Sequence, residues 1–567
     1  MRTIHSAPRA RRRRPAFLRM PPFPGARPAA ALDPARMAPL RPGETVTVAA
    51  LEELAELLRH YRVGGSFWRT PPALPAGATI LSAESIGEDR VHLTARAIGG
   101  GPVVIAGIGM DGARSKRGDG ARGMVMTGVV DLWALLTGAG RVVAGCDDEI
   151  ALVAGALGTR VLDPETLLPH DRIALLRNLA QRVEGVAYHC PFTGAALDAR
   201  GWLEMLGDWR RTISANAAIG QVLGIKAWKR PVMRQLLWSG EPPVFRDHVP
   251  SGRTPGQRSV ALWRSRVPEK ALAALERAGC TRAEIEDGFI RSTGLGTLLH
   301  PPFSIVVDTI GAHYDASRAS DLERILAETH FGDDLCTRAA RLIATIVANN
   351  ITKYASGDHQ AAALPRARRR VLVPGQVEDD LSVRHSGGAV RDDLGLLERV
   401  RSAEPHALLV YKPHPDVVSG HRRGGAPSRA ARRYADLIVE HGSIAALLSE
   451  VDAVHVISSL TGFEALLRGR EVVTHGTPFY AGWGLTRDLA GPFPRRARRL
   501  TLEQLVAGAL ILYPRYLDPL TRLPCPAEML VRRLSEQPAA RAGLVQRLRA
   551  AQGRLAVLGR SITGPAA

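Results

Sequence analysis

The stretch that decides the fold is ALLVYKPHPDV (407–417), which is followed along the chain by VHVISSLTGFEALLRG (454–469). Each segment is an apolar run that stops abruptly at residues suited to binding phosphate. The first run ends at Lys412 and His414, each followed by a proline that restricts the backbone. The second ends at Ser458 and Ser459 and continues directly as a helix. Two strand ends of this kind predict a nucleotide at the carboxyl edge of a parallel sheet.

The composition is that of a globular protein with an unusual basic excess. The 567 residues suffice for about three to four domains. The net charge is +20, and only six of the 75 basic residues are lysines. This excess predicts an anionic partner or reflects arginines scattered over solvated faces. The arginines are not interleaved with aromatic residues, so nucleic acid is not the expected partner.

Cysteine usage and hydropathy indicate the compartment. The five cysteines form no CxxC pair, so neither a disulfide framework nor a structural zinc site is expected. No apolar run reaches the ~20 residues of a membrane span, and no secretory signal follows the N-terminal arginines. We expect a cytoplasmic protein in peripheral contact with the inner membrane face.

The chain divides into five predicted regions. Residues 1–43 are rich in Arg, Pro and Ala and are expected to form a disordered tail. Residues 44–203 form an accessory α/β region, in which RVVAGCDDEIALVAGALGTRVL (141–162) reads as strand, helix and strand, with Asp147 or Asp148 as helix cap. The other predicted regions are a catalytic Rossmann-like domain (204–366), a nucleotide-sugar-binding Rossmann-like domain (367–525) and a helical C-terminal tail (526–567). The predicted fold class is α/β, a GT-B-like pair of Rossmann-type domains with an additional N-terminal α/β region.

Paired acids in the second predicted domain are catalytic candidates. Glu286 and Asp287 end a predicted strand, and Arg291 follows them. Acids beside an apolar strand are costly unless they are used or partnered. Arg291 could therefore be their structural partner, or one carboxylate could attack or stabilise an electrophilic sugar carbon. A nearby turn with Asp308 and His313, continuing through Tyr314 and Asp315, is also rich in hydrogen-bonding groups.

The predicted nucleotide-binding domain offers further ligands. Hydroxyls and free N–H groups at Ser458, Ser459 and Thr461 could bind an anion or simply cap the helix. Thr461 with Glu464 has the spacing of a capping box, and Glu464 could alternatively accept from ribose hydroxyls. Gln376 begins an acidic loop that could bind a base, a ribose or an acceptor hydroxyl, or cap the next helix. Nothing in the spacing fixes a metal site.

Together, these motifs resemble the capsule polysaccharide β-Kdo transferases of the KpsC/LipB type. The resemblance runs from about residue 217 to residue 521 and is closest to the second of the two transferase modules in longer members. The matching segments occur in the family's order and are IEDGFIRSTGLG (285–296), VVDTIGAHYDASRASDLE (306–323), VLVPGQVEDD (371–380), YKPHPDV (411–417), SSLTGFEALLRG (458–469), PFYAGWGLT (478–486) and RRLTLEQLVAGALILYPRYLDP (498–519).

The resemblance implies a retaining GT-B enzyme whose donor is CMP-Kdo, with no further cofactor and no metal. It implies a lipid-linked Kdo or lysophospholipid acceptor, and work alongside other capsule biosynthesis and export proteins. Asp287 matches the family's proposed nucleophile, whereas His414, Ser458 and Ser459 match residues that bind the CMP phosphate. His313 stands where the family has an aromatic residue.

Three other functions are weighed against this one. The same motifs would serve another CMP-activated keto sugar, such as a sialic acid. A capsule export or assembly factor could keep the fold without catalysis, although the intact Asp287, His414 and Ser458 argue against that. A nucleic-acid-binding protein is disfavoured because the arginines gather in the tails without a recognition motif.

Overall fold

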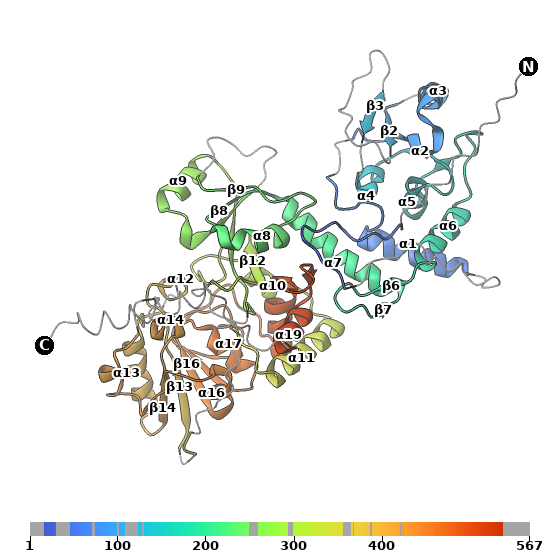
Figure 1. Cartoon of the computed structure of the whole chain (residues 1–567). Coiled ribbons are helices and arrows are strands. Elements are labelled where there is room, and N and C mark those ends of the chain that lie inside the picture. The colour runs from blue at the N-terminus through green and yellow to red at the C-terminus, as the bar shows by residue number, and fades with distance from the viewer. Residues whose placement is uncertain are drawn as a thin grey trace, which may run out of the picture. The chain divides into compact units, whose positions relative to one another are not determined.

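The computed structural model forms two compact units, which are described separately (Figure 1). The first unit comprises Met1–Ala217 with Trp238–Glu241, and the second comprises Ala218–Leu237 with Pro242–Ala567. Within the described residues, no helix is both long enough and apolar enough to cross a membrane. The described residues are 16–29, 46–70, 74–98, 101–107, 123–127, 130–248, 259–292, 299–354, 364–366, 368–385, 388–419, 422 and 425–536.

The first unit is built on a five-stranded parallel sheet in the order β3-β2-β1-β4-β5. This confirms the α/β character predicted for the N-terminal region. The segment 141–162 folds as predicted, with Asp148 as the N-cap of α5 (Glu149–Leu157), accepting a hydrogen bond from the Ile150 N–H at 2.9 Å. The strands are β1 (Thr79–Ser82), β2 (Val103–Gly107), β3 (Gly123–Thr127), β4 (Arg141–Val143) and β5 (Val161–Leu162).

Helices and one hairpin complete the first unit. The longest helix, α7 (Ala199–Ala217), packs against α1 (Val48–Tyr61), so this unit extends beyond the predicted boundary at 203. The remaining elements are α2 (Ala83–Ile86), α3 (Glu88–Ile98), α4 (Leu132–Leu136), α6 (Arg172–Glu184) and the hairpin strands β6 (Tyr188–His189) and β7 (Ala196–Leu197).

Part of the predicted N-terminal tail is ordered, so the prediction of disorder for residues 1–43 is wrong for residues 16–29. Phe17 and Leu18 are fully buried, and Arg19 forms an ion pair with Glu149 at 2.8 Å. The Arg- and Pro-rich composition led to the prediction of disorder, but the two apolar side chains gain stability by being removed from water. The remaining residues of the predicted tail lie outside the described residues.

The first sheet of the second unit is mixed, with the strand order β20-β19-β12-β11-β10-β8-β9. Strands β10 and β11 lie parallel and are connected by α9 (Glu269–Arg277), as expected for a Rossmann-like domain. However, β12, β19 and β20 run antiparallel to their neighbours, so only part of this sheet is Rossmann-like. The strands are β8 (Ile219–Leu223), β9 (Phe245–Arg246), β10 (Ser259–Trp263), β11 (Arg282–Asp287), β12 (Ser304–Asp308), β19 (Arg515–Leu517) and β20 (Pro524–Cys525).

The end of the described chain returns to this first sheet. After β19 and β20, helix α19 (Ala527–Glu536) buries Leu530 and Val531 in the same core. Arg533 in α19 donates to buried Asp518 at 3.1 Å. The predicted boundary between the nucleotide-sugar-binding domain and the C-terminal tail at residue 525 therefore does not match the structure, because α19 packs together with β19 and β20.

The second sheet of this unit has six parallel strands in the order β15-β14-β13-β16-β17-β18. Numbered along this part of the chain, the order is 3-2-1-4-5-6, which is that of a doubly wound nucleotide-binding fold. The parallel sheet predicted from the apolar runs is thus confirmed. The strands are β13 (Arg370–Pro374), β14 (Leu408–Lys412), β15 (Leu437–Ile438), β16 (Ala453–Val456), β17 (Glu471–Thr474) and β18 (Arg487–Asp488).

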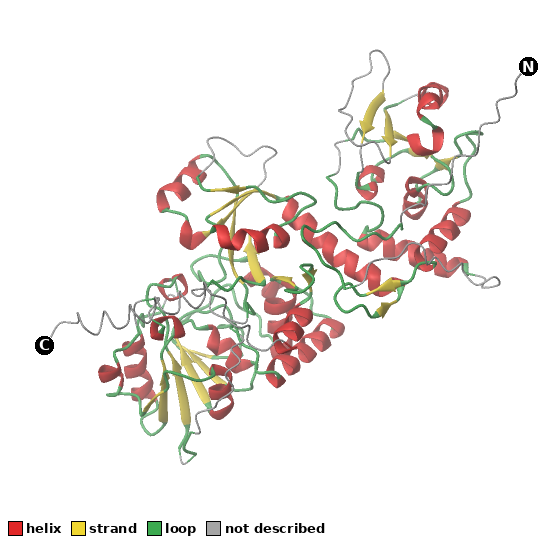
Figure 2. Ribbon diagram, viewed as in Figure 1, coloured by secondary structure: helices red, strands yellow, loops and turns green. Residues whose placement is uncertain are grey.

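Helices cover both faces of this second sheet (Figure 2). Alternate strand residues point to opposite faces. Val371 and Tyr411 therefore face α13 (Asp393–Ala403), whereas Leu372 faces α16 (Ile444–Glu450) and α17 (Leu460–Leu466). Burial on both faces explains why these strands read as continuous apolar runs.

The remaining helices lie around the two sheets of the second unit. Helix α18 (Leu502–Val506) continues as π-helical turns through Ala507–Leu512. The others are α8 (Arg230–Leu236), α10 (Asp321–Glu328), α11 (Asp333–Ala348), α12 (Leu381–Arg384), α14 (Pro415–Val418) and α15 (Ser428–Ala431).

The basic run 495–499 has a structural role. Arg495 pairs with Glu323 at 2.8 Å, and Arg496 donates to the Ala481 carbonyl at 2.8 Å. Arg498 donates to the Thr329 carbonyl at 2.8 Å. These three guanidinium groups satisfy acceptors of the protein itself, so they hold neighbouring segments of the second unit together.

Candidate active site

The point where strand order reverses in the second sheet lies between β13 and β16. In doubly wound sheets, ligands bind beyond the carboxyl ends of the strands at this reversal. Gln376 follows β13 there, and Ser458 and Ser459 follow β16. The structure therefore brings these three predicted ligands to one sheet edge.

Gln376 links the two strand ends. Its Oε1 atom accepts hydrogen bonds from the N–H groups of Ser458 and Ser459 at 3.0 and 3.1 Å, and its Nε2 atom donates to the Ser458 hydroxyl at 3.1 Å. These two backbone N–H groups were predicted as phosphate ligands, but Gln376 already occupies them. Because the Ser458 oxygen is the acceptor here, its hydroxyl hydrogen remains able to donate to a ligand.

Asp393 holds Gln376 in place. One carboxylate oxygen accepts from the Gln376 N–H at 2.9 Å, and the other accepts from the Tyr411 hydroxyl at 2.7 Å. Burial raises the pKa of Asp393 to about 6. Gly375 is required beside this carboxylate, because a Cβ atom there would lie 2.7 Å from Asp393 Oδ2 and 3.1 Å from the His414 nitrogen.

His414 and Lys412 lie beyond the neighbouring strand β14. The His414 ring caps α14, and its Nδ1 accepts from the Asp416 N–H at 3.1 Å. Burial lowers the pKa of His414, so the ring is neutral and carries its hydrogen on Nε2. The Lys412 ammonium lies 3.5 Å from the His441 carbonyl.

The helix after β16 begins differently from the prediction. The N-cap of α17 is Ser459, whose hydroxyl accepts from the Thr461 N–H at 3.2 Å. The capping box predicted for Thr461 and Glu464 is therefore wrong, because Thr461 already lies inside the helix. Glu464 is buried and accepts from the backbone N–H of Lys353 at 2.7 Å.

Asp287 lies at the end of β11 in a cluster of charged groups. Its Oδ2 is 2.8 Å from Arg291 Nε, and its Oδ1 is 3.6 Å from Lys229 Nζ. Arg291 is fully buried and pairs with Asp287, as expected if it is a structural partner of this acid. The Asp287 N–H donates to Glu286 Oε1 at 3.0 Å.

The two adjacent acids differ in ionisation. Burial favours a higher pKa for Asp287, but Arg291, Lys229 and Lys353 outweigh it and hold this pKa below its usual value. Burial and the neighbouring Asp287 charge raise the pKa of Glu286 to about 7. When the pKa values of two neighbouring acids differ in this way, one acid can act in its ionised form while the other takes up and releases a proton near neutral pH.

Lys353, which the sequence analysis missed, joins the two sets of residues. Its carbonyl accepts from the Arg291 N–H at 3.0 Å, and its N–H donates to Glu464. Its charge acts on both Asp287 and His414. Lys353 thus lies near both the acid pair of the first sheet and His414 beyond the second sheet.

Lysine scarcity was the available signal for these residues. The chain uses arginine for nearly all positive charges, yet Lys229, Lys353 and Lys412 are three of its six lysines. An ammonium group is a compact point charge, whereas a guanidinium group is bulky and planar.

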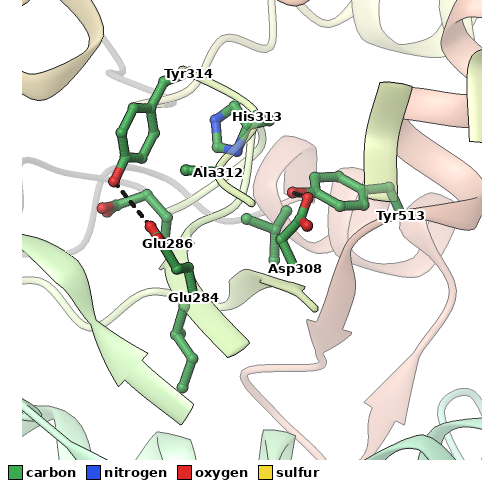
Figure 3. A pocket seen from close by; sticks show the side chains of 9 residues that line it. Glu284, Glu286, Asp308, Ala312, His313, Tyr314 and Tyr513 are labelled. Atoms are coloured by element: carbon green, nitrogen blue, oxygen red, sulfur yellow. Dashed lines mark hydrogen bonds between the residues drawn. The ribbon is translucent and has the colours of Figure 1, made fainter. Parts of the chain in front are cut away.

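A small pocket lies beside β11, and Figure 3 shows Glu284 and Glu286 reaching towards Tyr314 within it. The Tyr314 hydroxyl donates to Glu284 at 3.3 Å. His313 lies edge-on to Phe289, with ring centroids 5.0 Å apart. Burial lowers the pKa of His313 to about 3, so the ring is neutral and packs in the position of an aromatic residue.

The acids of the nearby turn are structural. Asp308 is buried and accepts from the Gly311 and Asp321 N–H groups, each at 2.9 Å, and from the Tyr513 hydroxyl at 2.8 Å. Asp315 pairs with Arg318 at 3.1 Å. Both carboxylates hold the chain after β12, and Asp308 also lines the pocket.

Comparisons with known proteins cover mainly the second unit. The family model described as capsule polysaccharide biosynthesis protein matches residues 258–354 and 330–516. Capsule polysaccharide modification protein LipA of Neisseria meningitidis serogroup A is 47% identical over 253 residues, which cover 45% of this chain and 36% of LipA. Lipopolysaccharide-processing protein LpsZ of Rhizobium meliloti is 42% identical over 236 residues, covering 41% of this chain and 53% of LpsZ. The chain thus spans between about a third and a half of these curated relatives.

A solved structure is also similar. It is the β-Kdo 2,4 transferase of Thermosulfurimonas dismutans KpsC, at 33% identity and a TM-score of 0.49, and the match covers 56% of this chain and 98% of that one. This identity across nearly a whole relative, together with the family-model match, shows that the chain belongs to the capsule polysaccharide biosynthesis protein family.

Proposed function

We propose that this chain is a retaining glycosyltransferase that moves β-Kdo from CMP-Kdo to a glycolipid acceptor in capsule polysaccharide biosynthesis. One observation carries the proposal, namely that Lys353 connects the segment of Asp287 to Glu464, in the helix that Ser459 caps, and that its charge acts on both Asp287 and His414. We infer that the ionised acid and the neutral donors suited to a leaving phosphate share one site. A two-lobed GT-B arrangement of the two sheets would serve this chemistry.

The leaving group is cytidylate, whose phosphate already activates the sugar. The His414 Nε2–H and the Ser458 hydroxyl are proposed to donate to its oxygens. Lys353 adds a positive charge to this corner, where Tyr354 and the two acids outweigh burial and raise its pKa to about 12. Fixed donors and charges of this kind stabilise negative charge as it develops during bond breaking.

Two displacements give retention. First, an Asp287 carboxylate oxygen bonds to the anomeric carbon while the bond to the phosphate oxygen breaks, and the electron pair leaves with CMP. Second, an acceptor hydroxyl oxygen bonds to that carbon, its proton passes to Glu286, and the bond to Asp287 breaks. The Asp287 carboxylate is thereby regenerated, and Glu286 returns the proton to solvent.

The test is transfer with purified protein. CMP-Kdo would be generated in situ and offered with synthetic glycolipid acceptors that carry or lack a terminal Kdo. The expected product has a β linkage by NMR, and CMP-sialate in place of CMP-Kdo is expected to give none. Folded protein that transfers no Kdo to either acceptor would refute the proposal.

His414→Ala should weaken CMP binding by about tenfold, because one donor to the phosphate is lost. Isothermal titration of CMP measures the change. His406→Ala is the matched control, since His406 is exposed before the other end of β14 and should bind CMP normally. Unchanged affinity in His414→Ala would remove this ring from the donor site.

Activity should depend on the ionisation of Glu286. This acid has a raised pKa of about 7, and only its ionised form can accept the acceptor proton. We therefore expect kcat to fall about tenfold per pH unit below pH 7 and to level off above it. Glu286→Gln should lower kcat and abolish this inflection, whereas an inflection that persists in Glu286→Gln would assign it to another group.

A further inference from the structure

Lys229 is close to Asp287 but takes part in none of the steps above. It ends the 3-10 turn Ala227–Lys229, just before α8, and its side chain is only 12% exposed. Its Nζ lies 3.4 Å from the centroid of the Trp263 ring and 3.6 Å from Asp287 Oδ1. The ring face attracts the ammonium group and fixes its position beside the carboxylate.

Lys229 and Arg291 both lie against Asp287, so two cations share one ionised carboxylate. Within the described residues, the buried Arg291 Nη2 makes no hydrogen bond. A buried donor without an acceptor is costly, so an anion from outside the chain is expected to complete the corner.

A donor sugar that is a 2-keto acid supplies such an anion. Its carboxylate carbon is bonded directly to the anomeric carbon, so the two are about 1.5 Å apart. When Asp287 attacks the anomeric carbon, the carboxylate must lie beside the attacking oxygen. Lys229 Nζ is 3.6 Å from that side chain and can reach a carboxylate placed there.

We propose that Lys229 binds the donor carboxylate and thereby selects 2-keto sugar acids over neutral sugars. This inference rests on the proposed function and adds a residue that determines donor specificity. Trp263 and Asp287 hold the ammonium in place before the donor arrives. The lysine suits the role because its compact charge fits beside Arg291 in a narrow corner.

The alternative is that Lys229 serves only as a counter-ion for Asp287. A counter-ion would affect every donor alike, whereas a carboxylate ligand affects only donors that carry the carboxylate. The lowered pKa of Lys229, caused by burial and partly offset by Asp287, fits either role. Binding measurements with matched ligands separate the two.

The test uses CMP, the slow donor CMP-3-fluoro-Kdo and its C1 carboxamide, each titrated against the full chain. Wild-type protein should bind the carboxylate donor about tenfold more tightly than the carboxamide. Lys229→Gln should remove this preference and leave CMP affinity unchanged, and Lys229→Arg should restore part of it. Lys226→Gln, an exposed lysine three residues earlier, should retain the full preference.

The outcomes separate this inference from the proposed function. If Lys229→Gln keeps the tenfold preference, Lys229 does not bind the carboxylate, even if the wild type transfers Kdo. If the wild type binds neither sugar donor and transfers none, the proposed function itself fails. Thermal melts identify any variant that does not fold. If Lys229→Gln does not fold, Lys229→Arg decides, because a binding role predicts a preference for the carboxylate donor that is smaller than the tenfold preference of the wild type but not lost.

Discussion

Asp287→Asn is expected to lower Kdo transfer by at least about a thousandfold while CMP still binds. The amide keeps the shape of the side chain but cannot form the covalent bond to the anomeric carbon. Single-turnover assays with CMP-Kdo measure the loss, and titration of CMP shows that the nucleotide corner is intact. Mass spectrometry of the wild type with a slow donor should also find the sugar attached to Asp287.

The substitution also removes the partner of a buried guanidinium, so stability must be controlled. Losing the anionic partner of Arg291 is expected to cost about 3 kcal/mol. Glu323→Gln is the matched control, because Glu323 is 8% exposed and pairs with Arg495 and Arg496 away from the proposed chemistry. It should lower the melting temperature but preserve turnover. Near-normal turnover by Asp287→Asn would exclude Asp287 as nucleophile.

The second sheet was predictable because its strands are buried on both faces. Parallel strands covered by helices read as unbroken apolar runs, and the polar residues after them mark the carboxyl edge. Val371 to Pro374 and Leu408 to Lys412 both show this pattern. The first sheet of the second unit does not show this pattern throughout, because the antiparallel strands β12, β19 and β20 join that sheet from distant parts of the chain.

The candidate site was predicted in its members but not in its contacts. Spacing alone fits a helix beginning at either Ser459 or Thr461, and only the fold decides between them. The role of Lys353 depends on its backbone N–H and carbonyl. Residues of almost any type have these groups, so the residue type does not indicate the role. The raised pKa of Glu286 depends on burial and on an adjacent charge, which arise only after folding.

Gln376→Glu should weaken CMP binding by about a hundredfold, because it places a negative charge beside the proposed phosphate position. The replaced nitrogen now donates to the Ser458 hydroxyl at 3.1 Å. A carboxylate would instead accept the Ser458 hydrogen and turn it away from the ligand.

Titration of CMP at several pH values tests this account, since protonating the introduced carboxyl should restore part of the affinity. Gln504→Glu makes the same change in a capping box with Thr501, where Glu also fits, so it should bind CMP normally. If Gln376→Glu bound CMP as tightly as the wild type, the phosphate could not lie at the reversal between β13 and β16. Cytidylate would then have to bind elsewhere on the second unit, and His414 and Ser458 would lose their proposed roles together.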